Sequence, residues 1–251
     1  VYTLNITAVN ITIEAEGNIS AGAKGFTAGS GSGKGGAGSG SAGGGGAGYG
    51  GAGGDGDNNA GSGGRTYGSL TRPIDIGSGG GTAVSSAGNP GGGAIKLNVS
   101  GTLMVNGTIT ADNSHEGGGG GSGGSIWIIT RNFTGSGNIT AKGGDGRGTS
   151  SASGGGGGGG RIAIYYKTKT FNGTIRTLGG NPGAAGAGAG SDGTNFSVSN
   201  ITILLAINQT TNVRAGTNIT ISGNLSVSAY NLTNYTFNVF IGNIQYFINS
   251  T

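Results

Sequence analysis

The sequence predicts an all-β fold with two domains: glycine-rich, solenoid-like stacked β-repeats over residues 1–194, and a β-sandwich-like domain over residues 195–251. Three observations support this prediction. A short unit recurs along the chain at a fixed spacing. The apolar residues inside the unit alternate with period two and are mostly β-branched, as strands prefer. No stretch shows the apolar period of an amphipathic helix.

The repeat is clearest between residues 125–144 and 161–180, in which Ile126 corresponds to Ile162 and Ile139 to Ile175, always 36 residues later. Weaker copies lie near residues 9–25 and 94–113, and all four share the pattern Gly-x-Ile-x-Ala/Thr or a close variant. Each unit is expected to form a strand, a bend, a second short strand and a glycine arc. Because two short strands cannot bury their own apolar face, the units are expected to stack on one another.

Glycine accounts for 65 of the 251 residues, and the low-complexity segment 29–69 contains no Leu, Ile, Val, Phe, Met or Trp. Such a segment cannot build an ordinary hydrophobic core. Three structures remain open for the glycine runs: flexible loops, turns of the solenoid, or bundled polyglycine helices with polyproline-like geometry.

After residue 195 glycine becomes scarce and the strand patterns lengthen, over 196–207, 218–229 and 235–248. This spacing is typical of an immunoglobulin-like β-sandwich or part of one. So few strands cannot close a sandwich. We therefore expect either that the chain continues or that another subunit donates a strand.

Charge and hydropathy argue against several classes of partner. The formal net charge is +4 with no basic cluster, which disfavours nucleic-acid binding. The longest apolar run, 201–207, is far shorter than the roughly 20 residues of a membrane helix, so no membrane span is expected. The chain has no cysteine and therefore no disulfide framework.

Asparagine followed two positions later by Ser or Thr is the strongest compositional signal. The chain has 52 Ser and Thr residues, so chance would give about five such tripeptides, but there are 16. The pattern is the acceptor of N-linked glycans and predicts an extracellular or cell-surface protein. The alternative is that Asn-Ile-Thr is merely a favourable strand-edge tripeptide. The predicted glycosylation sites are Asn5, Asn10, Asn18, Asn98, Asn106, Asn132, Asn138, Asn172, Asn195, Asn200, Asn208, Asn218, Asn224, Asn231, Asn234 and Asn249.

No catalytic constellation is predicted, because the nine acidic residues are scattered and the only histidine, His115, lies in a polar stretch. We expect no enzymatic activity and no cofactor other than covalent N-linked glycans. Asp55, Asp57 and Asn58 lie in a stretch that resembles a calcium-binding Gly-Gly-x-Gly-x-Asp nonapeptide. The final Asp is replaced by Asn58 and no tandem copies follow, so a calcium site is possible there but is not the favoured interpretation.

Two motifs carry a resemblance to known proteins. Gly-Gly-Ser-Ile-x-Ile and Gly-Gly-Arg-Ile-x-Ile, each followed by Gly-x-Ile-x-Ala/Thr-x-Gly-Gly, resemble segments of large prokaryotic cell-surface and adhesin-like proteins. The Asn/Thr-rich tail is similar to archaeal N-glycosylated surface or filament proteins. The resemblance implies a homo-oligomer or homopolymer: a structural subunit of an extracellular glycosylated filament or surface layer, joined by β-stacking and strand addition. The alternative is a monomeric adhesin or carbohydrate-binding stalk, and a polysaccharide-active β-helix enzyme is a third, less favoured, class.

Overall fold

A computed structural model describes residues 3–39, 42–59, 61–83, 86–113, 118–148, 152–184 and 186–199, and the backbone of 236–241 and 244–249. The chain divides into two units, Val1–Ile203 and Leu204–Thr251. Each unit is described by itself.

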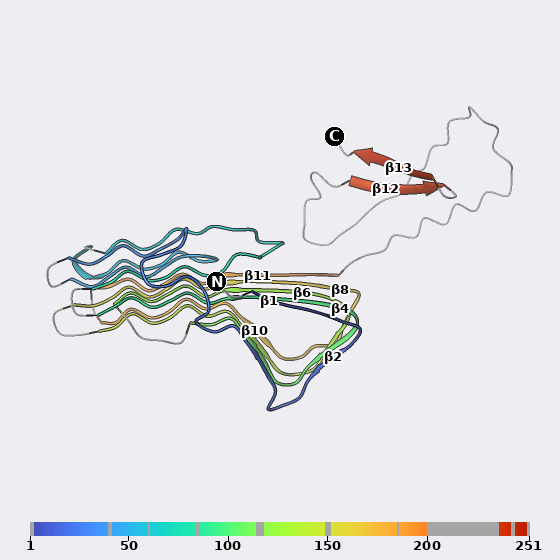
Figure 1. The fold of residues 1–251 in the computed structure, drawn as a ribbon, viewed down its shortest axis with the longest axis horizontal. Coiled ribbons are helices and arrows are strands. Elements are labelled where there is room, and N and C mark those ends of the chain that lie inside the picture. The colour runs from blue at the N-terminus through green and yellow to red at the C-terminus, as the bar shows by residue number, and fades with distance from the viewer. Residues whose placement is uncertain are drawn as a thin grey trace. The chain divides into compact units, whose positions relative to one another are not determined.

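The first unit contains two sheets in which every pairing is parallel (Figure 1). The larger sheet has the order β1-β4-β6-β8-β11, with β2 also paired to β4 and β9 to β6. The smaller sheet has the order β10-β7-β5-β3. The strands of the larger sheet are β1 (Thr3–Ala8), β2 (Ile11–Ile13), β4 (Ala94–Val105), β6 (Ser125–Thr134), β8 (Arg161–Tyr166), β9 (Thr168–Lys169) and β11 (Thr194–Ser199). Those of the smaller sheet are β3 (Asn18–Ser20), β5 (Thr108–Thr110), β7 (Asn138–Thr140) and β10 (Thr174–Arg176).

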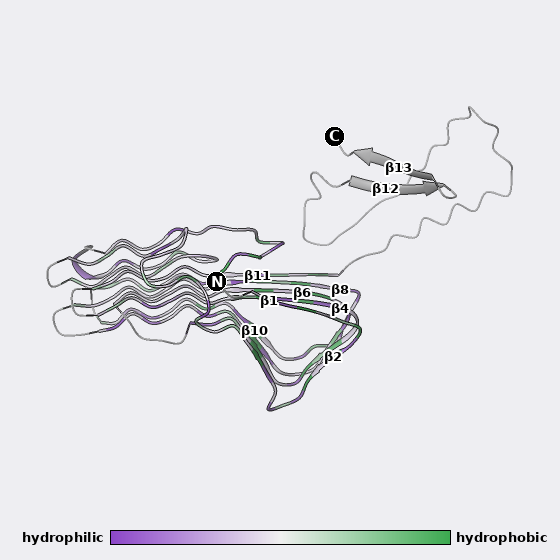
Figure 2. Ribbon diagram, in the orientation of Figure 1, coloured by the Kyte–Doolittle hydropathy of each residue, from purple (hydrophilic) through white to green (hydrophobic). Residues whose placement is uncertain are grey.

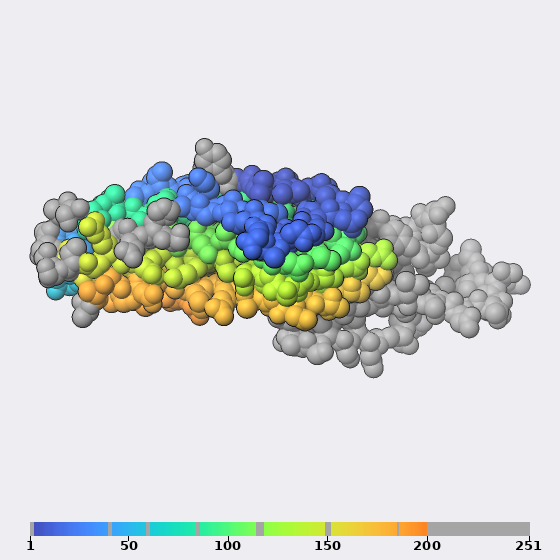
Figure 3. Space-filling view, turned by 90° about the horizontal axis from the view of Figure 1, so that it is seen from below, coloured from blue at the N-terminus to red at the C-terminus, as the bar shows by residue number. Residues whose placement is uncertain are grey.

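The sequence repeat sets the register of these strands. Ile126 is the cross-strand partner of Ile162, and Ile139 is the partner of Ile175. Residues that occupy the same place in two copies are therefore neighbours in one sheet. In space-filling view the copies lie as successive layers in chain order (Figure 3).

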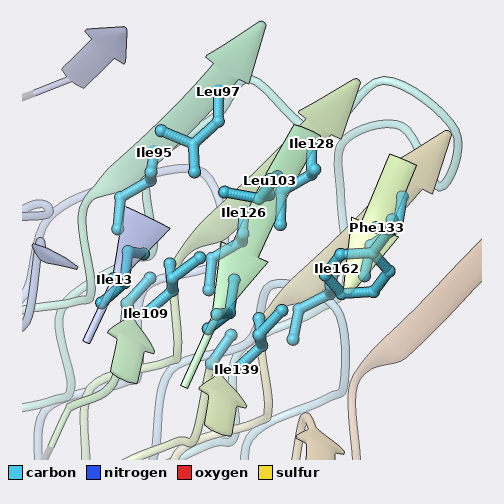
Figure 4. Close-up of a cluster of buried hydrophobic side chains, with 14 of the residues drawn as sticks. Ile13, Ile95, Leu97, Leu103, Ile109, Ile126, Ile128, Phe133, Ile139 and Ile162 are labelled. Carbon is cyan, nitrogen blue, oxygen red and sulfur yellow. The ribbon is translucent and has the colours of Figure 1, made fainter. Parts of the chain in front are cut away.

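One hydrophobic core lies between the inner faces of the two sheets (Figure 4). The larger sheet contributes Ile95, Leu97, Ile126, Ile128, Ile162 and Ile164, all at most 1% exposed. The smaller sheet contributes Ile109 and Ile139, which are fully buried. The period-two pattern places these residues on one face of each strand, and their burial supplies the main stabilisation of the sheets.

The glycine runs form an ordered array with a three-residue hydrogen-bonding period. Along segment 154–160, successive N–H groups donate in rotation to segments 141–147, 44–47 and 188–191. The donor–acceptor pairs are Gly154 with Arg147, Gly157 with Gly144, Gly160 with Ala141, Gly155 with Gly44, Gly158 with Ala47, Gly156 with Gly188, and Gly159 with Ser191. Three residues per turn with no internal hydrogen bonds is the geometry of a polyproline-type helix, and these glycines have no positive φ. The array is mostly pale in Figure 2, whereas apolar colour gathers along strands.

The array requires glycine because the backbones touch. A Cβ atom built on Gly46 would overlap the carbonyl oxygen of Gly156, and one built on Gly156 would overlap that of Gly180. The hydrogen on each Cα instead points at a neighbouring carbonyl, a weak but repeated attraction. Residues with side chains fit only where the array leaves room, as at fully buried Ala47.

The solenoid expected for residues 1–194 is wrong. In a solenoid each repeat contacts only the repeats beside it along the chain. Here segment 44–54 exchanges hydrogen bonds with distant segments: Gly155 donates to Gly44, Ala47 donates to Gly120, and Gly51 donates to Gly159. Segments without side chains can be surrounded by neighbours on several sides, so the fold is two parallel sheets joined to a multilayered glycine array.

The immunoglobulin-like sandwich expected for residues 195–251 is also wrong. The first strand of that range, β11, pairs in parallel with β8 and belongs to the larger sheet. Farther along, the described strands β12 (Thr236–Ile241) and β13 (Ile244–Asn249) form a two-stranded antiparallel sheet. Apart from strands, the described residues contain one short 3-10 turn, η1 (Asp57–Asn59).

Candidate functional site: sequon-bearing sheet faces and an aromatic pocket

The predicted glycan acceptors are unevenly exposed. Side chains are described for nine of the sixteen asparagines, and seven of these are exposed: Asn5, Asn10, Asn18, Asn98, Asn138, Asn172 and Asn195. Asn106 and Asn132 are half-buried. Asn200, Asn208, Asn218, Asn224, Asn231 and Asn234 lie outside the described residues, and for Asn249 only the backbone is described.

Strand alternation accounts for this exposure. Asn98 lies between Leu97 and Val99, which are 0% and 1% exposed. Asn138 precedes fully buried Ile139. Because successive side chains of a strand point to opposite faces, an asparagine beside an inward-facing apolar residue points outward.

Several of the asparagine amides form cross-strand hydrogen bonds. The Thr174 hydroxyl donates to Oδ1 of Asn138, and the amide N–H of Thr102 donates to Oδ1 of Asn10 at 2.8 Å. Both bonds use only the amide oxygen, which leaves Nδ2, the atom that carries an N-linked glycan, outside the contact. Asn132 differs, because its Nδ2 donates to the Thr102 hydroxyl at 3.1 Å. The cross-strand hydrogen bond of Asn138 therefore leaves its Nδ2 available to carry a glycan. At Asn132 the hydrogen bond and a glycan would compete for the same nitrogen.

The candidate calcium ligands act as acceptors for backbone N–H groups. Asp57 accepts from Gly43 at 2.6 Å and from Ser153 at 3.0 Å, while Asp55 accepts from Gly63 at 2.6 Å. Asn58 has a φ of 53° within η1. Each of these carboxylates takes the place of a peptide carbonyl within or at the margin of the array. In the described part of the chain, no three His, Cys, Asp or Glu side chains come together where they could hold a metal ion; His115 lies outside it.

An aromatic pocket on the outer face of the larger sheet was missed by sequence reasoning. Arg72, Trp127, Ile129 and Tyr165 line a shallow, mainly apolar pocket of about 270 Å³. Lys96 Nζ lies 4.4 Å from the centre of the Trp127 ring, and the Arg72 guanidinium lies 5.6 Å from it. The Tyr165 hydroxyl donates to the Thr71 carbonyl at 2.7 Å, which fixes the pocket against the loop that carries Arg72. The only sequence signal was the placement of the single tryptophan in a strand.

A buried polar network joins the glycine array to the larger sheet. The hydroxyls of Tyr49 and Ser125 lie 2.6 Å apart, and the Arg161 guanidinium donates to the Tyr67 carbonyl at 2.7 and 2.9 Å. The Tyr67 hydroxyl donates to the Ile76 carbonyl at 2.5 Å. Burial raises the pKa of Tyr67 to about 12 and the pKa of Tyr49 farther still, because a phenolate would be poorly solvated there.

Comparisons with family models, with curated proteins and with solved structures gave no match to this chain. Among the residues that the structure describes, none forms a helix long and apolar enough to cross a membrane.

Proposed function

We propose that this chain is a structural subunit of an extracellular, glycosylated filament or surface layer, in which copies join by strand addition at the edges of their sheets. The observation that carries the proposal is the open order of the two sheets. Among the described strands, the larger sheet ends at β1 and β11, and the smaller sheet ends at β3 and β10.

The edges are matched in length and direction. β1 and β11 each contain six residues, β3 and β10 each contain three, and all pair in parallel with their neighbours. The β11 edge of one copy can therefore add to the β1 edge of the next with unchanged polarity. Such a contact joins two different surfaces, and a contact of this kind that does not close into a ring generates a filament.

The outward-facing sequons support the extracellular part of the proposal. The seven exposed asparagines lie on both sheets and on their connections, so sugars attached there would cover the faces without entering the core. The carboxylates of Asp112 and Asp192 accept hydrogen bonds from backbone N–H groups, of Lys142 at 2.6 Å and of Gly179 at 2.9 Å. A structural role therefore accounts for these carboxylates without invoking catalysis.

The aromatic pocket favours the second candidate function, a monomeric cell-surface adhesin or carbohydrate-binding stalk. Aromatic rings beside cationic side chains offer both an apolar surface and hydrogen-bond donors to a sugar. In this alternative the sheet edges stay free and the pocket faces a ligand of another cell or surface.

Electron microscopy of the glycosylated protein separates the two functions. Regular fibres or sheets are expected for a structural subunit, and isolated particles at every concentration would favour the adhesin. The matched variants are Leu4→Lys and Leu70→Lys, because these residues are 37% and 41% exposed but only Leu4 lies on an edge strand. A charge pointing inward at a pairing edge should lower assembly by about tenfold or more, while Leu70→Lys assembles normally. Equal assembly by both variants would rule out the β1 edge.

A further inference from the structure

The aromatic pocket and one predicted glycan acceptor lie in the same row of the larger sheet. Asn98 of β4 is the cross-strand partner of Ile129 of β6, which in turn is the partner of Tyr165 of β8. Paired residues of parallel strands point to the same face, and neighbouring strands are about 4.8 Å apart. Asn98 therefore lies about one strand spacing from Ile129 and about two from Tyr165, two of the residues that line the pocket.

We propose that the glycan carried by Asn98 folds back onto the sheet and packs in the pocket of Trp127, Ile129 and Tyr165. This inference rests on the proposed function in one respect, that Asn98 carries a sugar. It adds a defined binding site for that sugar on the protein surface.

The chemistry of the pocket suits the sugar next to the protein. A pyranose ring has an apolar face of C–H groups, which packs against aromatic and aliphatic side chains such as Tyr165 and Ile129. Its hydroxyls accept hydrogen bonds from cationic donors, and Arg72 and Lys96 both border Trp127.

The size and shape of the pocket favour a tethered occupant over a free one. A volume of about 270 Å³ lies just below the usual range of small-molecule sites, and the pocket is shallow. A free sugar held by so few contacts would bind weakly. A sugar linked to Asn98 is present at an effective concentration on the order of millimolar, so a weak site is filled without further affinity.

Trp127 is the only tryptophan of the chain, so its fluorescence reports on this pocket alone. The experiment compares acrylamide quenching of the glycosylated wild type with that of Asn98→Gln and of Ser100→Ala. Both changes abolish the acceptor tripeptide, but Ser100→Ala keeps the asparagine side chain. Asn172→Gln removes a different exposed acceptor and is the control. Site-resolved glycopeptide mass spectrometry is run on every sample, and quenching is measured over a series of protein concentrations.

Trp127 is only 8% exposed, so the glycan can cover only that exposed part of the ring. With Asn98 occupied, we expect the quenching constant to rise by about twofold in both Asn98→Gln and Ser100→Ala, because this part of the ring loses its cover, and to stay unchanged in Asn172→Gln. Occupied Asn98 with no change in quenching would overturn the inference and leave the proposed function intact. Quenching that depends on protein concentration and not on Asn98 would assign the pocket to a contact between copies, which also overturns it. An unmodified Asn98 in wild-type protein would overturn it too, and modification elsewhere would show whether the glycoprotein proposal survives.

Discussion

The hydroxyl of Tyr49 lies 2.6 Å from the hydroxyl of Ser125, and this hydrogen bond links the glycine array to the first residue of β6. Both side chains are fully buried. The Ser125 hydroxyl also donates to the carbonyl of Asp75. The segment 29–69, which has no large aliphatic side chain, is thereby anchored to the sheets by one of its few large residues.

Removing the Tyr49 hydroxyl should therefore destabilise the first unit. Tyr49→Phe keeps the ring but leaves the Ser125 hydroxyl with one partner fewer, and the expected loss is about 1–2 kcal/mol in the free energy of unfolding. Urea denaturation measures it. Tyr165→Phe, which removes a hydroxyl from an exposed contact, is the control and should cost less than about 0.5 kcal/mol. Equal losses would mean that the buried bond has no special role.

Alkaline pH should weaken the fold through the two buried tyrosines. Their pKa values are raised in the folded state, so their contribution to stability is complete below the ordinary tyrosine pKa of about 10. It is lost as pH rises through the folded pKa, which is about 12 for Tyr67. Phenolate absorbance should show late-titrating tyrosines, and Tyr67→Phe should lessen the loss of stability above pH of about 10. Titration of all tyrosines near their ordinary pKa in folded protein would contradict this.

Replacing glycine by alanine should destabilise the protein much more in the array than at a glycine with room for a side chain. In Gly156→Ala the new methyl group overlaps the Gly180 carbonyl, so the backbones must separate and the expected cost is more than about 2 kcal/mol. Gly22→Ala is the matched control, since its nearest contact would be an ordinary 3.4 Å and its φ is not positive. It should change the free energy of unfolding by less than about 0.5 kcal/mol. Thermal denaturation of both variants measures these losses of stability. A Gly156→Ala variant as stable as the wild type would contradict close backbone packing in the array.

Site occupancy should follow the exposure of the amide nitrogen. Asn138 and Asn98 are exposed, whereas Asn132 is half-buried with its Nδ2 bonded to Thr102. Quantitative glycopeptide analysis of natively glycosylated protein should find the first two largely occupied and Asn132 largely unmodified. Full glycan occupancy at Asn132 would contradict this expectation and would show that modification precedes formation of the Asn132–Thr102 hydrogen bond.

The strands and their register could be predicted from the sequence, because period-two isoleucines and the 36-residue repeat are local signals. Ile126 and Ile162 pair as their equivalent places imply. The glycine array could not be predicted in the same way. Its segments consist mostly of glycine, so too few side chains distinguish them to indicate that Gly155 pairs with Gly44 and not with another glycine. The solenoid prediction failed there, where side chains no longer specify neighbours.

The candidate sites divide along similar lines. Sequons are local tripeptides, and an asparagine next to an inward-facing isoleucine, as at Asn138 and Asn10, is expected to point outward; both are exposed. The aromatic pocket joins Arg72 to Trp127 across a long sequence separation, and no local pattern marks it. The sequence around Asp57 resembles a metal-binding loop, but the Asp57 carboxylate accepts hydrogen bonds from the N–H groups of Gly43 and Ser153 in the array.

The most direct test of the structural role uses the absence of cysteine from the chain. Thr7 and Val198 lie at the two ends of one cross-strand row, Thr7–Asn98–Ile129–Tyr165–Val198. If β11 of one copy adds to β1 of the next in the same register, Thr7→Cys and Val198→Cys in one chain come within disulfide distance between copies. Oxidation of assembled double variant should give a ladder of covalent oligomers on a non-reducing gel, with neither single variant exceeding a dimer. A double variant that stays monomeric, or stops at dimers as the single variants do, would contradict assembly through these edges.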